Sequence, residues 1–330
     1  MVDVAKQDLT PMFLTVALYK FVDLPDFEAL RAPLMDCCAA HGIQGTLLLA
    51  REGINGTVAG SPEGVRRLLA YLRSDPRFAD LEHKEASASA PPFRKMKVKL
   101  KREIVTLGVP EVNPNTMAGE YVRPEDWNRL IADPGVVVVD VRNDYEIALG
   151  SFEGAVDPHT AVFSELPEWV AKESAPGGLL ASKPKVAMFC TGGIRCEKST
   201  AFMRLKGFDQ VYHLEGGILK YLETVPEAES RWQGECFVFD ERVSVGHGLK
   251  PGDWNLCRAC GIPLNAEDKR SSHYEAGVSC AHCHDQTTAD QKARFRERQH
   301  QVDLARQRNT VHLGAKPAPK AKVRRGKVAA

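Results

Sequence analysis

The sequence predicts an α/β protein built from three consecutive parts, each with its own signature. Residues 1–110 give the order β-α-β-β-α-β, residues 125–225 alternate buried strands with helices, and residues 226–310 contain two Cys-x2-Cys pairs. A chain of 330 residues is long enough for two or three domains. Its 43% hydrophobic and 26% charged residues are ordinary for a globular protein and exclude a wholly disordered or fibrous chain.

The first part is expected to fold as a ferredoxin-like, acylphosphatase-like sandwich of one sheet and two helices. Runs rich in β-branched and aromatic residues predict its strands, and apolar residues spaced by three and four predict its helices. Pro25 opens the first helix, and Ser61 is a capping residue for the second. In chain order we expect strands at 13–19, 43–50, 54–59 and within 93–107, with helices after the first and third of them.

The last of these strands carries four lysines, Lys95, Lys97, Lys99 and Lys101, which alternate with apolar residues. A period of two places all four ammonium groups on one face of the strand. Like charges in a row repel one another unless an anion neutralises them, so this face is a candidate site for the phosphate backbone of a nucleic acid. Lysines on an edge strand also prevent aggregation, and both interpretations stay open.

A linker rich in proline and asparagine is expected at 110–124, before a parallel α/β domain at 125–225. The strands of that domain are short continuous apolar runs, of the kind buried on both faces of a parallel sheet. The apolar runs lie at 136–139, 185–189 and 211–214, and helical patterns lie at 163–172 and 197–206.

The sharpest chemical signal is the loop 190–196, Cys-Thr-Gly-Gly-Ile-Arg-Cys, which joins a buried strand to a helix. A thiol there faces backbone N–H groups, the positive end of a helix dipole and the guanidinium of Arg195. All three stabilise a thiolate, so Cys190 and Arg195 are the predicted catalytic residues. The Cys-x4-Arg spacing fits a group smaller than phosphate, such as a sulfane sulfur. Cys196 is either a resolving thiol or a small packing residue.

This loop and three further segments together resemble a rhodanese domain. The segments are Asp-Val-Arg at 140–142, Gly-Ala-Val at 154–156 and Leu-Glu-Gly-Gly-Ile at 214–218. Their order and spacing match a single domain of that family. The spacing alone predicts a sulfurtransferase that moves sulfane sulfur to a small thiol or protein acceptor.

Segments outside that domain resemble a family of larger proteins, the rhodanese-domain tRNA uridine(34) hydroxylases. They lie at 53–57, 93–99, 101–105 and 234–243. The start of the sequence has no signal-peptide pattern, so a cytoplasmic protein is expected. The resemblance implies an oxidoreductase that uses molecular oxygen to convert the wobble uridine of tRNA to 5-hydroxyuridine. It also implies that Cys190 is essential and carries a persulfide, for which a sulfur donor protein is a possible partner. Besides this reading and the sulfurtransferase, a third possibility is an RNA-binding persulfide sensor without catalysis.

Cys257, Cys260, Cys280 and Cys283 form two Cys-x2-Cys pairs with nineteen residues between them. Two such pairs can close a tetrahedral thiolate site for structural zinc, while free thiols or a redox pair are the alternatives. No glycine-rich nucleotide motif is present in the sequence, so a flavin, nicotinamide or nucleotide cofactor has no support.

The C-terminal end is strongly basic, with twelve Lys or Arg against two acids from Lys292 onward. The stretch 287–309 predicts an exposed basic helix that begins with a capping box at Thr287 and Asp290, and 311–330 predicts a disordered tail. A basic end on an acidic body suits tRNA, although a solvated tail is equally compatible. The longest apolar runs are far shorter than the ~20 residues that span a bilayer, so no membrane partner is expected.

Overall fold

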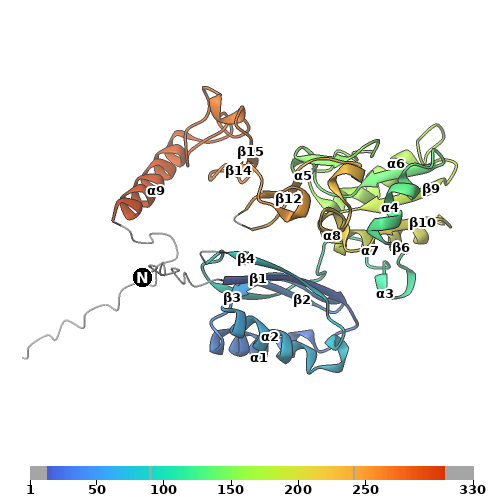
Figure 1. Ribbon diagram of the computed structural model, residues 1–330, viewed down its shortest axis with the longest axis horizontal. Coiled ribbons are helices and arrows are strands. Elements are labelled where there is room, and N and C mark those ends of the chain that lie inside the picture. The colour runs from blue at the N-terminus through green and yellow to red at the C-terminus, as the bar shows by residue number, and fades with distance from the viewer. Residues whose placement is uncertain (1–12, 89–90, 241, 309–330) are drawn as a thin grey trace, which may run out of the picture.

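The computed structural model describes residues 13–88, 91–240 and 242–308, and Figure 1 shows its three parts. The predicted α/β class is confirmed. Within the described residues, no helix is long and apolar enough to cross a membrane.

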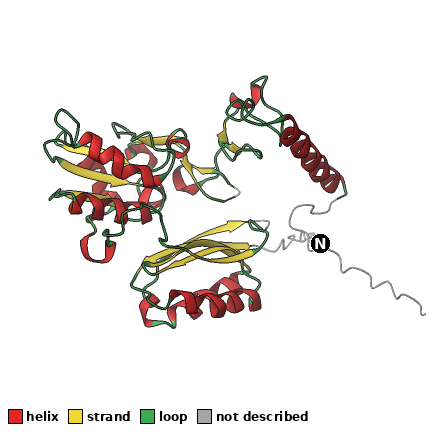
Figure 2. Cartoon of the chain, turned by 180° about the vertical axis from the view of Figure 1, so that it is seen from behind, coloured by secondary structure: helices red, strands yellow, loops and turns green. Residues whose placement is uncertain are grey.

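The N-terminal part is a five-stranded sheet with two helices on one face, which Figure 2 shows as two layers. The sheet order is β4-β1-β3-β2-β5, and only β5 runs parallel to its neighbour. The helix α2 is capped as predicted, since the Ser61 hydroxyl accepts the Gly64 N–H at 3.1 Å. The elements are β1 (Phe13–Phe21), α1 (Phe27–Ala40), β2 (Gln44–Ala50), β3 (Gly53–Gly60), α2 (Pro62–Arg73), β4 (His83–Ala88) and β5 (Met96–Leu100).

The strand that completes the ferredoxin-like order differs from the expected one. The prediction placed it within 93–107, whereas β4 takes that role beside β1 and the lysine-rich strand β5 is an addition at the opposite edge. The β4 sequence His-Lys-Glu-Ala-Ser-Ala has no β-branched or aromatic residue, so its local pattern carries no strand signal. The segment is a strand because it pairs with β1, although its residues have low strand propensity.

The central part is the predicted parallel sheet, in the order β6-β10-β9-β7. Its first strand, β6, lies inside the stretch expected to be a linker, because three residues are too few to form a recognisable apolar run. The elements are α3 (Pro114–Met117), β6 (Glu120–Val122), α4 (Pro124–Ile131), β7 (Val136–Asp140), α5 (Asp144–Ile147), β8 (Gly150–Phe152), α6 (Leu166–Glu173), β9 (Lys185–Phe189), α7 (Ile194–Leu205), β10 (Val211–Leu214) and α8 (Gly217–Thr224).

The chain beyond α8 first returns to the central part and then forms the cysteine-rich region. Trp232 on β11 pairs with Phe152 on β8, and its ring packs edge-to-face on that phenylalanine in the core. The elements are β11 (Trp232–Gly234), β12 (Cys236–Phe237), β13 (Ser244–Val245), β14 (Asn255–Leu256), β15 (Pro263–Leu264) and α9 (Ala289–Gln307).

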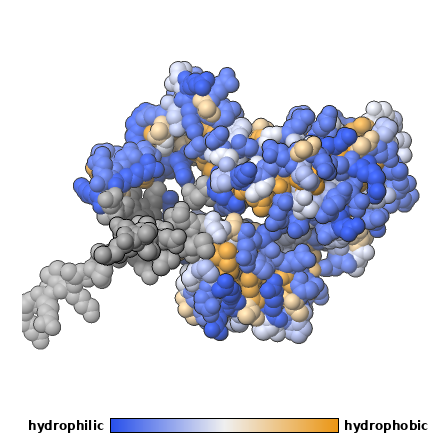
Figure 3. All heavy atoms as spheres, viewed as in Figure 1, coloured by the Kyte–Doolittle hydropathy of each residue, from blue (hydrophilic) through white to orange (hydrophobic). Residues whose placement is uncertain are grey.

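The basic helix α9 is present, with a mainly hydrophilic surface (Figure 3). Its capping box is formed by Thr288 and Gln291, one residue later than the predicted pair Thr287 and Asp290. The Thr287 hydroxyl instead donates to the carbonyl oxygen of Cys283, so it is unavailable as the cap. The predicted disordered tail, 311–330, lies outside the described residues.

The face of the N-terminal sheet that carries no helices turns toward the central part in Figure 1. Lys198 on α7 joins the two parts, and its side chain is only 1% exposed. Its ammonium donates to Glu52 at 2.8 Å, to Glu103 at 2.5 Å and to the carbonyl of Val105 at 2.9 Å. Two carboxylates and one carbonyl thus satisfy all three N–H donors of a buried lysine.

Candidate active site

The Cys190 loop joins the carboxyl end of the central strand β9 to the N-terminus of α7. Cys190 is fully buried, and its sulfur accepts the N–H of Gly193 at 3.2 Å. Gly193 has φ +106°, a backbone conformation that a residue with a side chain rarely adopts. The glycine therefore allows the turn that aims a backbone donor at the thiol, as the sequence predicted.

A second helix fixes the direction of the loop's peptide groups. The N–H groups of Ile218 and Leu219, in the first turn of α8, donate to the carbonyls of Cys190 at 3.0 Å and Thr191 at 3.1 Å. A Cβ at Gly217 would lie 2.5 Å from the Cys190 carbonyl oxygen, so only glycine permits this approach. With its carbonyls held outward by α8, the loop presents N–H groups to the sulfur.

Arg195 lies beside the loop but is committed to a carboxylate. Its two terminal nitrogens donate to Glu146 at 2.6 and 2.7 Å, and the Thr191 hydroxyl donates to the same carboxylate at 3.2 Å. Both members of the ion pair are buried. This bidentate geometry holds the guanidinium as a fixed positive charge near Cys190.

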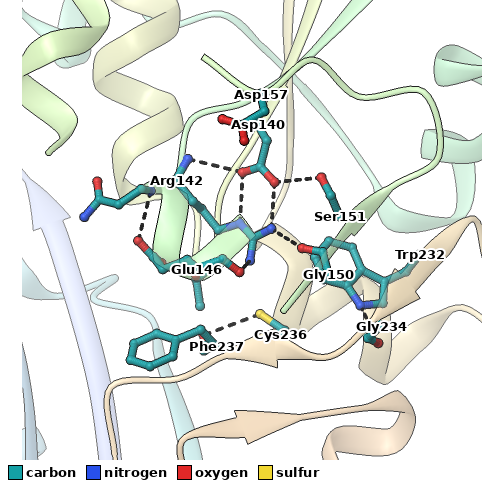
Figure 4. A network of polar contacts seen from close by, with 12 residues as sticks. Asp140, Arg142, Glu146, Gly150, Ser151, Asp157, Trp232, Gly234, Cys236 and Phe237 are labelled. Atoms are coloured by element: carbon teal, nitrogen blue, oxygen red, sulfur yellow. Dashed lines mark hydrogen bonds and ion pairs between the residues drawn. The ribbon is translucent and has the colours of Figure 1, made fainter. Parts of the chain in front are cut away.

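A second ion pair lies beside the backbone of Glu146 (Figure 4). Arg142 forms a bidentate pair with Asp140 at 2.6 and 2.9 Å, and both side chains are almost wholly buried. It also donates to the backbone carbonyls of Glu146 at 3.2 Å and Gly150 at 2.6 Å, and its guanidinium lies 5.1 Å from the Trp232 ring. The Asp-Val-Arg segment therefore positions the backbone that carries Glu146.

These contacts give the two loop cysteines, Cys190 and Cys196, different pKa values. Burial alone raises the pKa of Cys190, but the Cys196 thiol, the charge of Arg195 and the loop N–H groups outweigh it and bring the pKa to about 5. Burial and the neighbouring Cys190 raise the pKa of Cys196 well above its usual range. Near neutral pH Cys190 is thus a thiolate, while Cys196 stays a thiol that donates to it.

The N-terminal sheet places two side chains against this loop that sequence reasoning did not single out. The Tyr19 hydroxyl donates to Glu197 at 2.7 Å, and a Cβ at Gly193 would lie 2.7 Å from the same hydroxyl. Lys84 on β4 donates to the carbonyl of Gly216, in the turn before α8. Both come from strands more than a hundred residues away in sequence, so no local pattern in the loop could reveal them. Glu146, likewise, lies in a short polar helix without a motif of its own.

The four candidate lysines lie on or beside the edge strand β5, and all four are exposed. Val98 is buried against the helix side of the sheet, so Lys97 and Lys99 face the opposite side. Among the described residues, no carboxylate forms an ion pair with Lys95, Lys97, Lys99 or Lys101.

Arginines of the basic helix α9 form contacts within the fold. Arg296 pairs with Glu275 at 2.6 Å, and Arg298 donates to the carbonyl of Gly277 at 2.8 Å while stacking on Phe295. These arginines brace α9 against the cysteine-rich region.

The four cysteines of the two Cys-x2-Cys pairs converge on one point. Their sulfurs lie 3.9 Å apart for Cys257 and Cys283, 3.7 Å for Cys260 and Cys280, and 3.8 Å for Cys280 and Cys283. A tetrahedron with metal–sulfur bonds of about 2.3 Å has edges of roughly 3.8 Å. The cluster therefore has the size of a tetrathiolate metal centre. A second group, His273, His284 and Asp285, lies nearby in the chain, with His284 half-buried and the other two exposed.

Two family models match the chain. Residues 13–104 match the UPF0176 acylphosphatase like domain, and residues 123–224 match the rhodanese-like domain.

Proteins named tRNA uridine(34) hydroxylase are similar over nearly the whole length. The one from Acaryochloris marina is 60% identical over 304 residues, which cover 92% of this chain and 97% of the relative. The one from Albidiferax ferrireducens is 62% identical over 309 residues, covering 94% and 97%. Among solved structures, a rhodanese-related protein from Thermoplasma volcanium aligns with 25% identity and a TM-score of 0.26, covering 32% of this chain and 93% of the other.

We expect the thiol of Cys190 to ionise with a midpoint near pH 5, because the hydrogen bonds and positive charge around it favour the thiolate. The pKa of Cys190 is lower in the folded protein than in the unfolded chain, so ionisation of this thiol stabilises the fold. The stabilisation is complete above the ordinary thiol pKa and is lost as the pH falls through about 5. The ultraviolet absorbance of the thiolate, recorded as the difference from a Cys190→Ser variant, measures the midpoint. Cys196→Ala should raise it; a midpoint in the ordinary thiol range would contradict the assignment.

Proposed function

Because this chain belongs to the tRNA uridine(34) hydroxylase family, we propose that it hydroxylates the wobble uridine of tRNA with Cys190 as the reactive group. The product is 5-hydroxyuridine, and molecular oxygen is the co-substrate. The observation that carries this proposal is the buried Cys190 sulfur, which accepts the Gly193 N–H at 3.2 Å inside a rhodanese loop. We propose that the reaction takes place in the cytoplasm, where tRNA is available as the substrate.

The loop is suited to carry a persulfide. In this step the Cys190 thiolate attacks the sulfane sulfur of a donor, and the donor's bond to that sulfur breaks with its electron pair leaving on the donor. The sulfur donor is a protein or a small sulfane compound. The N–H groups of the loop hold the cysteine sulfur, and Arg195, fixed by its pair with Glu146, is the second proposed catalytic residue because its positive charge stabilises the thiolate.

The tRNA contact is proposed for the sheet face that carries the lysines. Strand register connects Lys97 at one edge to Lys84 at the other through Thr46, Thr57 and Ala17 in a single row. With strands about 4.8 Å apart, this row spans roughly 19 Å. The middle of the row carries small side chains, and we propose that a nucleotide chain lies along it between the exposed lysines and the Cys190 loop.

The cysteine cluster is proposed to hold structural zinc. Four thiolates fill a tetrahedral zinc site completely, so the ion would stabilise the fold of the cysteine-rich region and have no open position for substrate. The cluster and its partly buried neighbours Ala259 and Tyr274 form a small core of their own.

A sulfurtransferase is the second candidate, favoured by the same loop. In that case Cys190 would pass its sulfur to a small thiol or protein, and tRNA would not be a substrate. The family relationship makes this candidate the weaker one, and the nucleoside measurement below separates the two.

Cys190→Ser should abolish 5-hydroxyuridine while leaving the fold intact, because a hydroxyl is a far weaker nucleophile and cannot hold a sulfane sulfur. The measurement is mass spectrometry of tRNA nucleosides from cells that lack the native protein and express each variant. Cys37→Ser, outside the loop, is the matched control and should keep activity. Full activity of Cys190→Ser would remove the loop from the mechanism, and altered thiolation with unchanged hydroxyuridine would favour the sulfurtransferase.

Changing Lys95, Lys97, Lys99 and Lys101 together to Gln should flatten the salt dependence of tRNA binding. Each lost phosphate contact lowers the slope of log affinity against log salt by about 0.7 to 0.9. The control changes Arg66 and Arg67 to Gln, since both are exposed on the helix side of the same domain. Equal slopes for the native and quadruple variants would make β5 a solubilising edge instead.

The purified protein should contain about one zinc ion per chain, and Cys257→Ser or Cys280→Ser should release it. Elemental analysis of the protein gives the content, and Cys38→Ser is a control because that buried cysteine lies in the N-terminal core. Metal-free protein with four reactive thiols in this region would rule the site out.

A further inference from the structure

The ammonium group of Lys84 lies over the Cys190 loop although its strand belongs to another domain. Register pairs Lys84 with Ala17 on β1, which directs its side chain to the sheet face that lacks helices. Its nitrogen donates to the carbonyl of Gly216. Among the described residues, and apart from those adjacent in sequence, this nitrogen is the heavy atom found within 4 Å of a Cβ built on Gly192, at 4.0 Å. Lys84 therefore lies on the open side of the loop.

The electrostatic setting of Lys84 points to an anion. No carboxylate among the described residues forms an ion pair with Lys84, and within the same residues its ammonium hydrogen-bonds to a neutral carbonyl. A lysine has three N–H donors, so two remain for another acceptor. Burial lowers the pKa of Lys84, while the charge of Cys190, followed by those of Cys236 and Glu223, acts in the opposite direction. Glu223 forms its ion pair with Lys220, so Cys190 is the largest favourable charge acting on Lys84. Such a setting is unfavourable for an ammonium group unless a negative charge compensates it.

We propose that Lys84 is a further catalytic residue of this site, which binds the negatively charged outer sulfur of the Cys190 persulfide. That sulfur extends about 2 Å beyond the cysteine sulfur, a bond length known from disulfides. The N–H groups of the loop already hold the inner sulfur, and Lys84 supplies donors on the side that the loop leaves open. The N-terminal domain thus completes the sulfur site of the central domain. This inference rests on the proposed role of Cys190 as the sulfur-carrying residue.

Other charged groups around Cys190 have partners that fix them. Arg195 is bound to Glu146, and Glu197 accepts the Tyr19 hydroxyl. The remaining neighbour on α7 is the Cys196 thiol, which donates to the thiolate. Among these groups, Lys84 is the cation whose donors are not taken up by a carboxylate.

Two measurements on the full chain test the proposal without tRNA, so they remain interpretable if the hydroxylation proposal fails. The first is the ionisation midpoint of Cys190, from the thiolate absorbance. The second is sulfur transfer from thiosulfate to cyanide: the thiolate takes the outer sulfur and sulfite leaves, then cyanide takes that sulfur and the thiolate is regenerated. Lys84→Gln keeps an N–H donor for Gly216 but removes the charge. Lys84→Met is a second neutral variant of similar length.

Both neutral variants should raise the Cys190 midpoint by about half a pH unit to one unit, which lowers the thiolate fraction roughly three- to tenfold below the midpoint. Sulfur transfer should fall at least about tenfold, because the persulfide charge lies closer to the lysine than the thiolate does. Lys84→Arg should restore most of both. Lys185→Gln removes the same charge at the other end of β9 and should change neither.

An unchanged midpoint and unchanged sulfur transfer in a folded Lys84→Gln or Lys84→Met protein would overturn the proposal and leave Lys84 as a packing residue. Loss of tRNA affinity with a reduced salt slope, at unchanged sulfur chemistry, would also overturn it, because Lys84 would then bind a phosphate. Equal losses in the Lys84→Arg variant would show that shape rather than charge matters, against the proposal.

Discussion

The buried ammonium of Lys198 is the interaction on which the arrangement of the active site depends. It lies on the helix that begins at the Cys190 loop, and both of its carboxylate partners, Glu52 and Glu103, come from the N-terminal side. Removing one partner of a buried pair costs several kcal/mol, about 3 to 5, because an uncompensated charge remains. The three-way contact therefore sets one docking position of the sheet against α7. Tyr19 and Lys84 reach the loop only in that position.

A series of ion pairs and hydrogen bonds leads from Asp140 to the Cys190 loop. Asp140 orients Arg142, which holds the backbone at Glu146; Glu146 then orients Arg195 beside the thiolate. A group that acts by electrostatics is most effective when its position is fixed before the reaction begins. Here the energy of folding fixes these dipoles and charges, so no reorganisation is required when charge moves at the sulfur.

The parts of the site that are local in sequence could be predicted, and the parts that are assembled across the fold could not. The Cys190 loop lies within seven residues, and the four cysteines carry a ligand spacing, so both were recognisable. Glu146 has no motif, and Lys84 lies on a strand of polar and small residues that only its pairing with β1 defines. Strand propensity reports side-chain packing, so it fails where an edge strand packs little. The short strand β6 was missed for the related reason that three residues cannot show a period.

Trp232 has a consequence for the order in which the protein can be made. The central domain is not finished when its last helix, α8, is synthesised, because β11 must still add to β8 and place the indole beside Arg142. Domains generally fold as units while the chain leaves the ribosome, at about 5 to 20 residues per second. During that interval the guanidinium that supports Glu146 lacks its aromatic neighbour, and the aromatic core of the domain lacks one ring. The nascent protein therefore completes the surroundings of Arg142, which holds the backbone of Glu146, only after the segment beyond the domain has emerged.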